Sequence, residues 1–124
     1  MPFPRIYNLD GVTTGASEII GIPFVFSDAS PKMVFQLPAG CYLVTTQIKI
    51  VVPFDDAAAT LLIGDNLIPD KYMKAEENDP TEIAEYETNP YEKITAIKNI
   101  YLAISPAASV QGSGLVVIEY AVNS

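Results

Sequence analysis

Four aspartates flank one short apolar segment, and their type and spacing come nearest to a chemical site. Asp55 and Asp56 precede the segment 58–63, and Asp65 and Asp70 follow it. Two carboxylates can act as acid and base where burial separates their pKa values. Several carboxylate oxygens together can bind Ca²⁺. However, the spacing matches no known calcium loop, and aspartate at strand ends is ordinary turn chemistry. We therefore expect turn or capping roles, with a calcium site as the alternative.

Other reactive residue types are scarce, because the 124 residues include no histidine and a single cysteine. Without histidine, neither a Ser-His-Asp or Cys-His arrangement nor a His-ligated metal can form. Cys41 begins a strand pattern and lacks a cationic neighbour, so we expect a small apolar packing role. Gly112, Ser113 and Gly114 precede a strand without the Lys-Ser/Thr of a phosphate loop, which favours a hairpin turn. We expect no enzyme activity, no metal and no cofactor.

Tyrosines form the last candidate set. Tyrosine stacks on sugar rings in carbohydrate-binding β-sandwiches, and it also suits protein interfaces, where one end of the ring is apolar and the other wet. Because the sequence has no tryptophan, we favour core or protein-interface roles over glycan binding. The tyrosines concerned are Tyr42, Tyr72, Tyr86, Tyr91 and Tyr101.

The elements that position these residues are predicted to be strands, because apolar side chains alternate with a period of two. Turn-forming residues separate the segments, and Pro23 marks an edge or a bulge. Short strands at this spacing predict an all-β fold, an antiparallel β-sandwich or jelly roll, as one domain over residues 1–124. The expected strands are 17–26, 33–37, 41–52, 58–63, 92–98, 100–104 and 115–122.

The net charge of −8 argues against partners that carry negative charge. Nucleic acids and anionic membrane surfaces are bound through clustered lysine and arginine, and the seven basic residues here are scattered. No apolar run is long enough to span a bilayer, and no signal peptide is evident. Six of the eight net charges fall within residues 70–92. We expect this segment to be a long acidic loop in solvent, with one helical turn near 79–86.

Several strands are apolar on both faces, so both faces need cover. In the alternating pattern, Leu43 and Val51 lie opposite the main apolar face of 41–52, and Leu115 and Val117 lie opposite that of 115–122. We expect these four side chains to meet a second copy of the chain in a homo-oligomer.

The N-terminal segment 1–8 is apolar and stiffened by proline. It forms either a short edge strand or an arm that docks on a neighbouring protein. The side chains that would make this contact are Phe3, Pro4, Arg5, Ile6 and Tyr7.

The layout of motifs over residues 34–122 resembles small jelly-roll structural proteins of tailed bacteriophages and prophages. In that group a strand ending in Ile-Gly-Asp leads to a Pro-Asp-x-Tyr segment, and a glycine-rich turn precedes a final strand with Ile-Glu-Tyr. The motifs here are 37–40, 53–56, 59–65, 69–72, 105–108 and 112–120.

The resemblance implies a non-catalytic virion component, made in the bacterial host cytoplasm. Proteins of this group serve as capsid decoration (cement) proteins, head fibres or tail parts. We favour a decoration protein, which implies a homotrimer bound to the major capsid protein. Attachment would then fall to the N-terminal arm and the loops at one end. The alternative is a tail or fibre component that binds a receptor or glycan.

Overall fold

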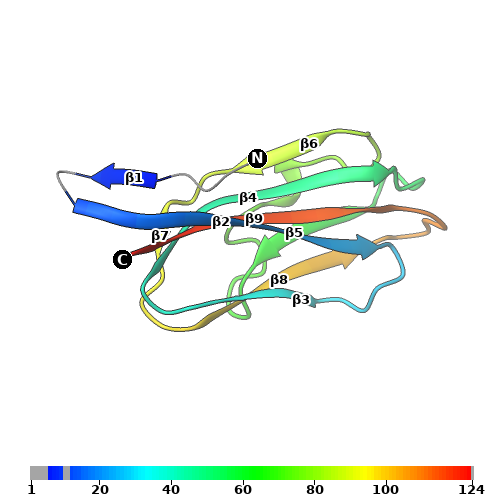
Figure 1. Ribbon diagram of the computed structural model, residues 1–124. Coiled ribbons are helices and arrows are strands. Elements are labelled where there is room, and N and C mark those ends of the chain that lie inside the picture. The colour runs from blue at the N-terminus through cyan, green and yellow to red at the C-terminus, as the bar shows by residue number, and fades with distance from the viewer. Residues whose placement is uncertain (1–5, 10–11, 124) are drawn as a thin grey trace.

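The chain folds into two antiparallel β-sheets packed face to face (Figure 1). The computed structural model describes the backbone of residues 6–9 and 12–123 and the side chains of residues 17–122. Within these ranges there is no α-helix, and the single 3₁₀ turn is η1 (Ala75–Glu77). No described helix is long and apolar enough to cross a membrane. The strands are β1 (Ile6–Leu9), β2 (Val12–Val25), β3 (Lys32–Leu37), β4 (Cys41–Val52), β5 (Thr60–Gly64), β6 (Glu85–Thr88), β7 (Glu92–Lys93), β8 (Lys98–Ser105) and β9 (Ser113–Asn123).

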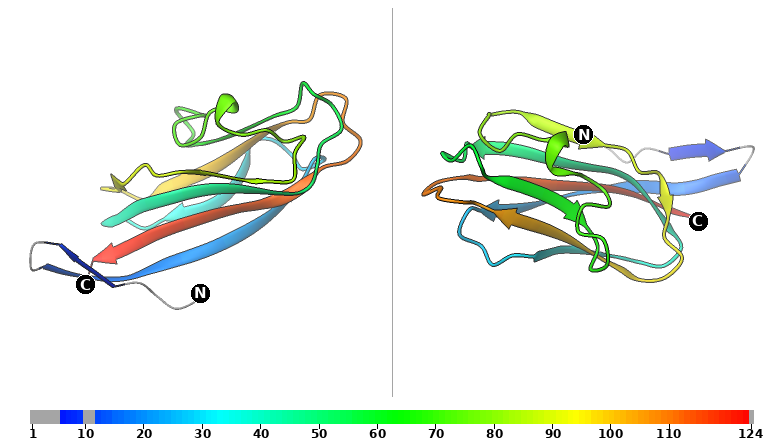
Figure 2. Two further views of the ribbon diagram at one scale, coloured as in Figure 1. Left: turned by 90° about the horizontal axis from the view of Figure 1, so that it is seen from above. Right: turned by 180° about the vertical axis from the view of Figure 1, so that it is seen from behind.

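The strand order confirms the expected sandwich. The larger sheet has the order β1-β2-β9-β4-β6, with β7 also paired to β4, and the smaller sheet has the order β3-β8-β5. From β2 to β5 the chain changes sheet at every step, and it does so again from β7 to β9 (Figure 2). This alternation between two antiparallel sheets is the arrangement of a jelly roll.

The core lies between the sheets and consists mainly of aliphatic side chains, together with two phenylalanines, Cys41, Tyr72 and Met73. Each aliphatic or phenylalanine side chain, once buried, stabilises the fold by about 1.5–3 kcal/mol relative to exposure. Cys41 is among the buried residues as a free thiol, which confirms its expected packing role. The largest fully buried side chains are Phe24, Phe54, Leu37, Leu43, Ile48, Ile50, Leu61, Ile63, Met73, Ile94, Ile100 and Leu102.

Strand β4 has two irregularities that its alternating sequence does not reveal. Its pairing with β9 shifts between Leu43 and Thr45 and again between Ile50 and Val52. An extra residue in one strand reverses which side chains face inward beyond it. Leu43 is therefore 0% exposed in the core, whereas Val51 is 51% exposed. The expectation that Leu43 lies on an outer face with Val51 is wrong for this reason.

The acidic segment 70–92 is more than a solvated loop. Its backbone forms β6 and β7 along β4, and Tyr72 and Met73 are buried in the core. Met73 also bridges to Ile63 at the edge of the smaller sheet. The helical turn lies at Ala75–Glu77, earlier than the expected 79–86. In β6 the side chains that face the core alternate with glutamates that face solvent, so a strongly acidic segment can form a strand of the sheet.

Two other expected strands, 17–26 and 92–98, also take a specific form. Pro23 pairs with Leu115 of β9, and the opposite edge of β2 is open there because β1 pairs only as far as Ala16. This edge position is what a residue without an N–H requires. The expected strand 92–98 is wrong in extent, since β7 is only two residues long and Ile94 leaves the sheet for the core.

Candidate functional site

The four candidate aspartates lie at opposite ends of the sandwich. Asp55 and Asp56 precede β5, and Asp65 and Asp70 follow it. A five-residue strand rises by about 3.4 Å per residue, which separates the pairs by about 17 Å. Among the described residues no group of three or more His, Cys, Asp or Glu side chains could hold a metal ion. The structure therefore gives no support to the calcium alternative.

We call residues 53–59 and 106–112 the loop-bonded end, because their two loops are joined by hydrogen bonds. The Val110 N–H donates to Asp55 Oδ1 at 2.9 Å. The Ala108 N–H donates to Asp56 Oδ2 at 2.9 Å. The N–H groups of Ala58 and Ala108, which both donate to the Asp56 carboxylate, lower the pKa of Asp56. Both aspartates thus have the turn-forming role expected from the sequence.

A phenylalanine closes the loop-bonded end from inside. Phe54 is 2% exposed, and its N–H donates to the Pro80 carbonyl at 2.9 Å. Gly112 has a φ of +146°, and a Cβ there would lie 2.6 Å from Phe54 Cδ1. Only glycine fits this backbone and this approach of the ring. The close fit holds the β8–β9 connection against the β4–β5 connection.

We call residues 64–72 and 92–98 the ion-pair end. Asp65 is buried here and accepts two backbone hydrogen bonds at Oδ1, from Leu67 at 2.9 Å and Ile68 at 2.7 Å. Its Oδ2 lies 3.2 Å from Lys98 Nζ. Buried carboxylates need such partners, because the loss of hydration is otherwise uncompensated.

The remaining charges of the ion-pair end extend this arrangement into a cluster. Glu92 Oε2 lies 3.3 Å from Lys71 Nζ and 3.5 Å from Lys98 Nζ. Lys98 Nζ also donates to the Tyr72 hydroxyl at 3.2 Å. Lys71 Nζ completes the set at 3.9 Å from Asp65 Oδ2. These five residues form the ion-pair cluster, whose two acids and two lysines cancel in charge.

The pKa shifts within the cluster follow from these contacts. Burial raises the pKa of Asp65, but its two N–H donors and the Lys98 ammonium outweigh this effect and lower it. Burial likewise raises the pKa of Glu92. The hydrogen bond from Tyr72 and the charges of the two lysines outweigh this effect and lower the pKa overall. Burial lowers the pKa of Lys98, yet its contacts with Tyr72 and Asp65 raise it above the usual value. Burial, followed by the hydrogen bond with Glu92, raises the pKa of Tyr72 to about 12.

Each of these shifts moves the pKa further from neutral pH and so favours the protonation state that the group already has there. General acid–base catalysis requires the opposite, a pKa moved toward the working pH. The cluster is therefore built to hold its segments together and is poorly suited to exchange protons near neutral pH.

Sequence reasoning missed this cluster, although two of the resemblance motifs meet in it. The segment 59–65 ends in Asp65, and the segment 69–72 supplies Lys71 and Tyr72. No local pattern connects these residues to Glu92 and Lys98, because only the pairing of the strands brings them together.

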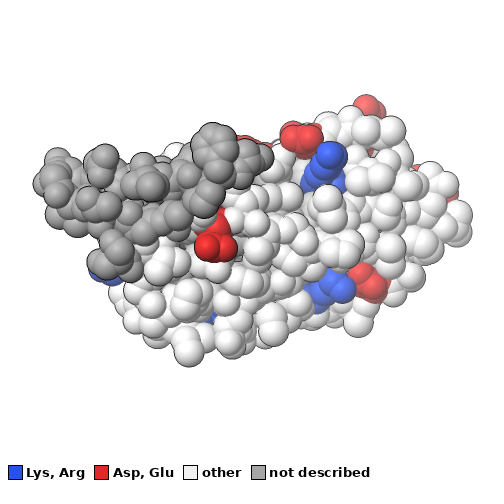
Figure 3. Space-filling model, viewed as in Figure 1, with Lys and Arg blue, Asp and Glu red and all other residues white. Residues whose placement is uncertain are grey.

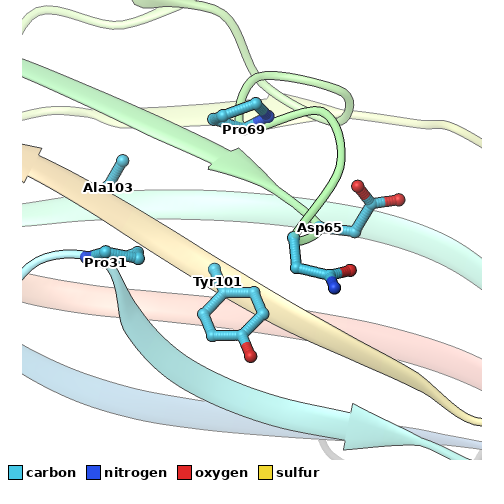
Figure 4. Close-up of a pocket in the computed structure, with 6 residues that line it drawn as sticks. Pro31, Asp65, Pro69, Tyr101 and Ala103 are labelled. Carbon is cyan, nitrogen blue, oxygen red and sulfur yellow. The ribbon is translucent and has the colours of Figure 1, made fainter.

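A shallow pocket of about 330 Å³ lies beside the ion-pair end (Figure 4). Tyr101 and Ala103 lie along β8 at its floor, and Pro31 faces Pro69 across it in the close-up. The walls are mostly apolar. The lining residues are Pro31, Asp65, Asn66, Pro69, Tyr101 and Ala103.

Two of the predicted interface residues do share an outer face. Leu115 and Val117 of β9 are half-buried and point away from the core, next to Pro23 and Gly21 of β2 in the register of the strands. Charged side chains are sparse over β2 and β9 in the view of Figure 3. Val51 is exposed near the end of β4, and Leu43 belongs to the core. The sheet therefore brings two of the four together.

The predicted N-terminal contact falls largely outside the described residues. Phe3, Pro4 and Arg5 are not described, and Ile6 and Tyr7 are described only as backbone of β1. That backbone pairs with β2, so the edge-strand alternative holds for residues 6–9. Figure 2 shows β1 and the start of β2 extending beyond the packed sheets.

The five candidate tyrosines occupy different environments. Tyr72 is buried in the ion-pair cluster, and Tyr91 is 66% exposed. The Tyr42 ring lies 5.7 Å from Lys93 Nζ, and Tyr101 lines the pocket. Tyr72 therefore has the core role that the sequence favoured for these tyrosines.

Comparison with known proteins finds similarity at the level of fold. No known protein family matches the sequence, and no curated protein matches it either. A chain of the cyanophage Pam1 capsid asymmetric unit has a TM-score of 0.71 at 18% identity, covering 88% of this chain and 86% of that chain. A chain of the acid-stable capsid of Helicobacter pylori bacteriophage KHP30 has a TM-score of 0.74 at 15% identity, covering 90% and 91%. The chain therefore shares its β-sandwich fold with proteins of phage capsids.

Proposed function

We propose that the protein is a non-catalytic structural component of a bacteriophage virion, and specifically a decoration protein bound to the major capsid protein. The observation that carries the proposal is the likeness to chains of two phage capsid structures over nearly their whole lengths. A fold alone does not define a function, so the chemistry of the surface must agree with it.

The described charged groups favour a structural role. The acids at the loop-bonded end bind backbone N–H groups, and those of the ion-pair cluster bind lysines. Both arrangements stiffen loops. A protein that reinforces a shell acts through buried area and shape, for which rigid loops are an advantage.

The outer face of the larger sheet is the surface we propose for contact between copies. Ile19 is 53% exposed and Val25 is 42% exposed on β2, and in the register Leu115 and Val117 of β9 lie between them. Burial of this strip against a second copy would remove apolar area from water. We propose a homotrimer that buries Leu115 and Val117, with Val51 at its border.

Attachment to the shell is assigned to the N-terminal segment 1–8, with Phe3, Pro4, Arg5, Ile6 and Tyr7 as its contact residues. The extension of β1 and the start of β2 beyond the packed sheets supports this proposal, because it holds the described part of this segment clear of the body of the sandwich.

Rebinding to undecorated particles tests the proposal. Particles of the encoding phage, prepared without this gene product, are mixed with the purified protein and sedimented. We expect saturable binding in a fixed ratio to the major capsid protein, and loss of binding after deletion of residues 1–8. Val117→Glu should weaken the oligomer, whereas the matched control Val110→Glu at the loop-bonded end should not. Absence of binding by the full chain would contradict the proposal, and binding to purified tails or host glycans would favour the fibre alternative.

A further inference from the structure

The turn that follows β5 holds one large aliphatic side chain in solvent. Leu67 is 83% exposed. Around it, the Asp65 N–H donates to the Ile68 carbonyl at 3.1 Å, and Lys71 N–H donates to the same oxygen at 3.2 Å. A Cβ at Gly64 would lie 2.1 Å from that oxygen, so the turn closes on glycine. Leu67 thus projects from a backbone that is already ordered, which lowers the entropy lost when it binds.

The same turn forms one wall of the apolar pocket. Asn66 and Pro69, on either side of Leu67 in sequence, line it together with Tyr101 and Ala103 of β8. Its volume of about 330 Å³ exceeds the roughly 150 Å³ of a cavity that accepts benzene. The pocket therefore has room for a leucine side chain. The exposed Leu67 side chain and a pocket of sufficient size for it therefore lie side by side on one surface.

The charges beneath this surface suit a contact between identical chains. A net charge of −8 makes most encounters between two copies repulsive. The ion-pair cluster is an exception, because its two acids and two lysines cancel locally. Ile68 and Met33, each about half exposed, extend the apolar area around the pocket. A second copy that approaches the cluster meets acids that are already paired with lysines, and Asp70 is the acid of this turn that lies outside the cluster.

From these observations we propose that two copies of the chain pair reciprocally, each placing Leu67 in the pocket of the other. A surface that contains both parts of a contact is complementary to itself about a twofold axis, and each contact is then made twice. This pairing is separate from the proposed contact on the larger sheet. Where its twofold axis crosses the symmetry axis of the oligomer that this sheet forms, the pairing closes into a species of twice the mass.

Sedimentation equilibrium over a concentration series tests the pairing. We expect the wild-type mass to double as the concentration rises. Leu67→Ser and Ala103→Met should each raise the concentration at which half of the molecules are paired by at least tenfold. Leu67→Ser removes the projection, and Ala103→Met fills the recess from the surface. Val110→Ser, at an equally exposed valine of the loop-bonded end, should pair like wild type. Thermal midpoints measured alongside establish that each variant is folded.

A cross-linking experiment identifies the contact itself. Leu67→Cys and Ala103→Cys chains are mixed and treated with a short bismaleimide, to which the buried Cys41 is inaccessible. We expect covalent pairs that contain one chain of each kind, and none when Val110→Cys replaces Leu67→Cys. A wild-type mass that never doubles up to roughly millimolar concentration, the range of the weakest specific contacts, would overturn the proposal. Doubling that survives either Leu67→Ser or Ala103→Met would also overturn it. Neither result bears on particle binding, which is measured separately.

Discussion

The loop-bonded end and the ion-pair end begin from similar sequence and use it differently. Each receives aspartates from one side of β5, yet Asp55 and Asp56 bind backbone N–H groups while Asp65 binds both N–H groups and lysines. The difference arises from the neighbouring chain. The β8–β9 connection offers amides, whereas the start of β8 offers Lys98. A carboxylate's role is therefore decided by the strand that the topology places beside it.

The largest effect is expected from Phe54, which closes the loop-bonded end. Phe54→Ala should reduce the free energy of unfolding by about 3–5 kcal/mol, because it removes a fully buried ring and leaves a cavity beside Gly112. Urea unfolding checks this, with Tyr91→Ala as the exposed aromatic control. Equal losses in the two variants would show that the ring does not organise this end.

At the ion-pair end, Asp65→Ala should cost about 2–4 kcal/mol in the free energy of unfolding. The substitution leaves two part-buried N–H donors and part of the Lys98 charge without an acceptor. The matched change Asp56→Ala, at an exposed carboxylate with two backbone donors, should cost clearly less. The comparison between the ends fails if urea unfolding ranks the two variants in the opposite order.

Acid should weaken the ion-pair end. The pKa values of Asp65 and Glu92 are lowered in the folded chain, so their stabilisation is present above the unfolded values near 4 and is lost as the pH falls through the folded values. Urea midpoints measured from pH 7 to pH 3 should fall for the wild type and fall less for Asp65→Asn. Parallel curves for the two proteins would contradict the linkage.

Alkali acts on the same cluster through its tyrosine. The folded pKa of Tyr72 is raised to about 12 from an unfolded value of about 10, so its stabilisation is complete below pH 10 and is lost between pH 10 and pH 12. Tyrosinate absorbance should show one group titrating near pH 12, and Tyr72→Phe should remove that step. If the step persists in Tyr72→Phe, another tyrosine is responsible.

The smallest effect is local. Asp56→Asn keeps one acceptor oxygen and weakens the hydrogen bonds to the amides of Ala58 and Ala108. We expect faster hydrogen exchange at these two amides, with exchange in β4 and β9 unchanged. Faster exchange throughout the sheets would mean that the loop-bonded end contributes to global stability through Asp56.

The fold was predictable because period-two alternation survives in most strands. Residues 41–52 and 115–122 were placed correctly, and Pro23 on an open edge followed from its missing N–H. The face of Leu43 was not predictable, because a bulge leaves no mark on an alternating sequence. Sequence spacing also could not show that Lys98 lies near Asp65, because that contact depends on how β5 and β8 pair.

The composition of purified virions decides whether the protein belongs to the capsid. We expect quantitative mass spectrometry of particles from the encoding phage to find this chain in many copies, in a fixed ratio to the major capsid protein. Cryo-electron microscopy of the same particles should place a β-sandwich of this size on the outer shell. Absence of the chain from intact, infectious particles would contradict the account.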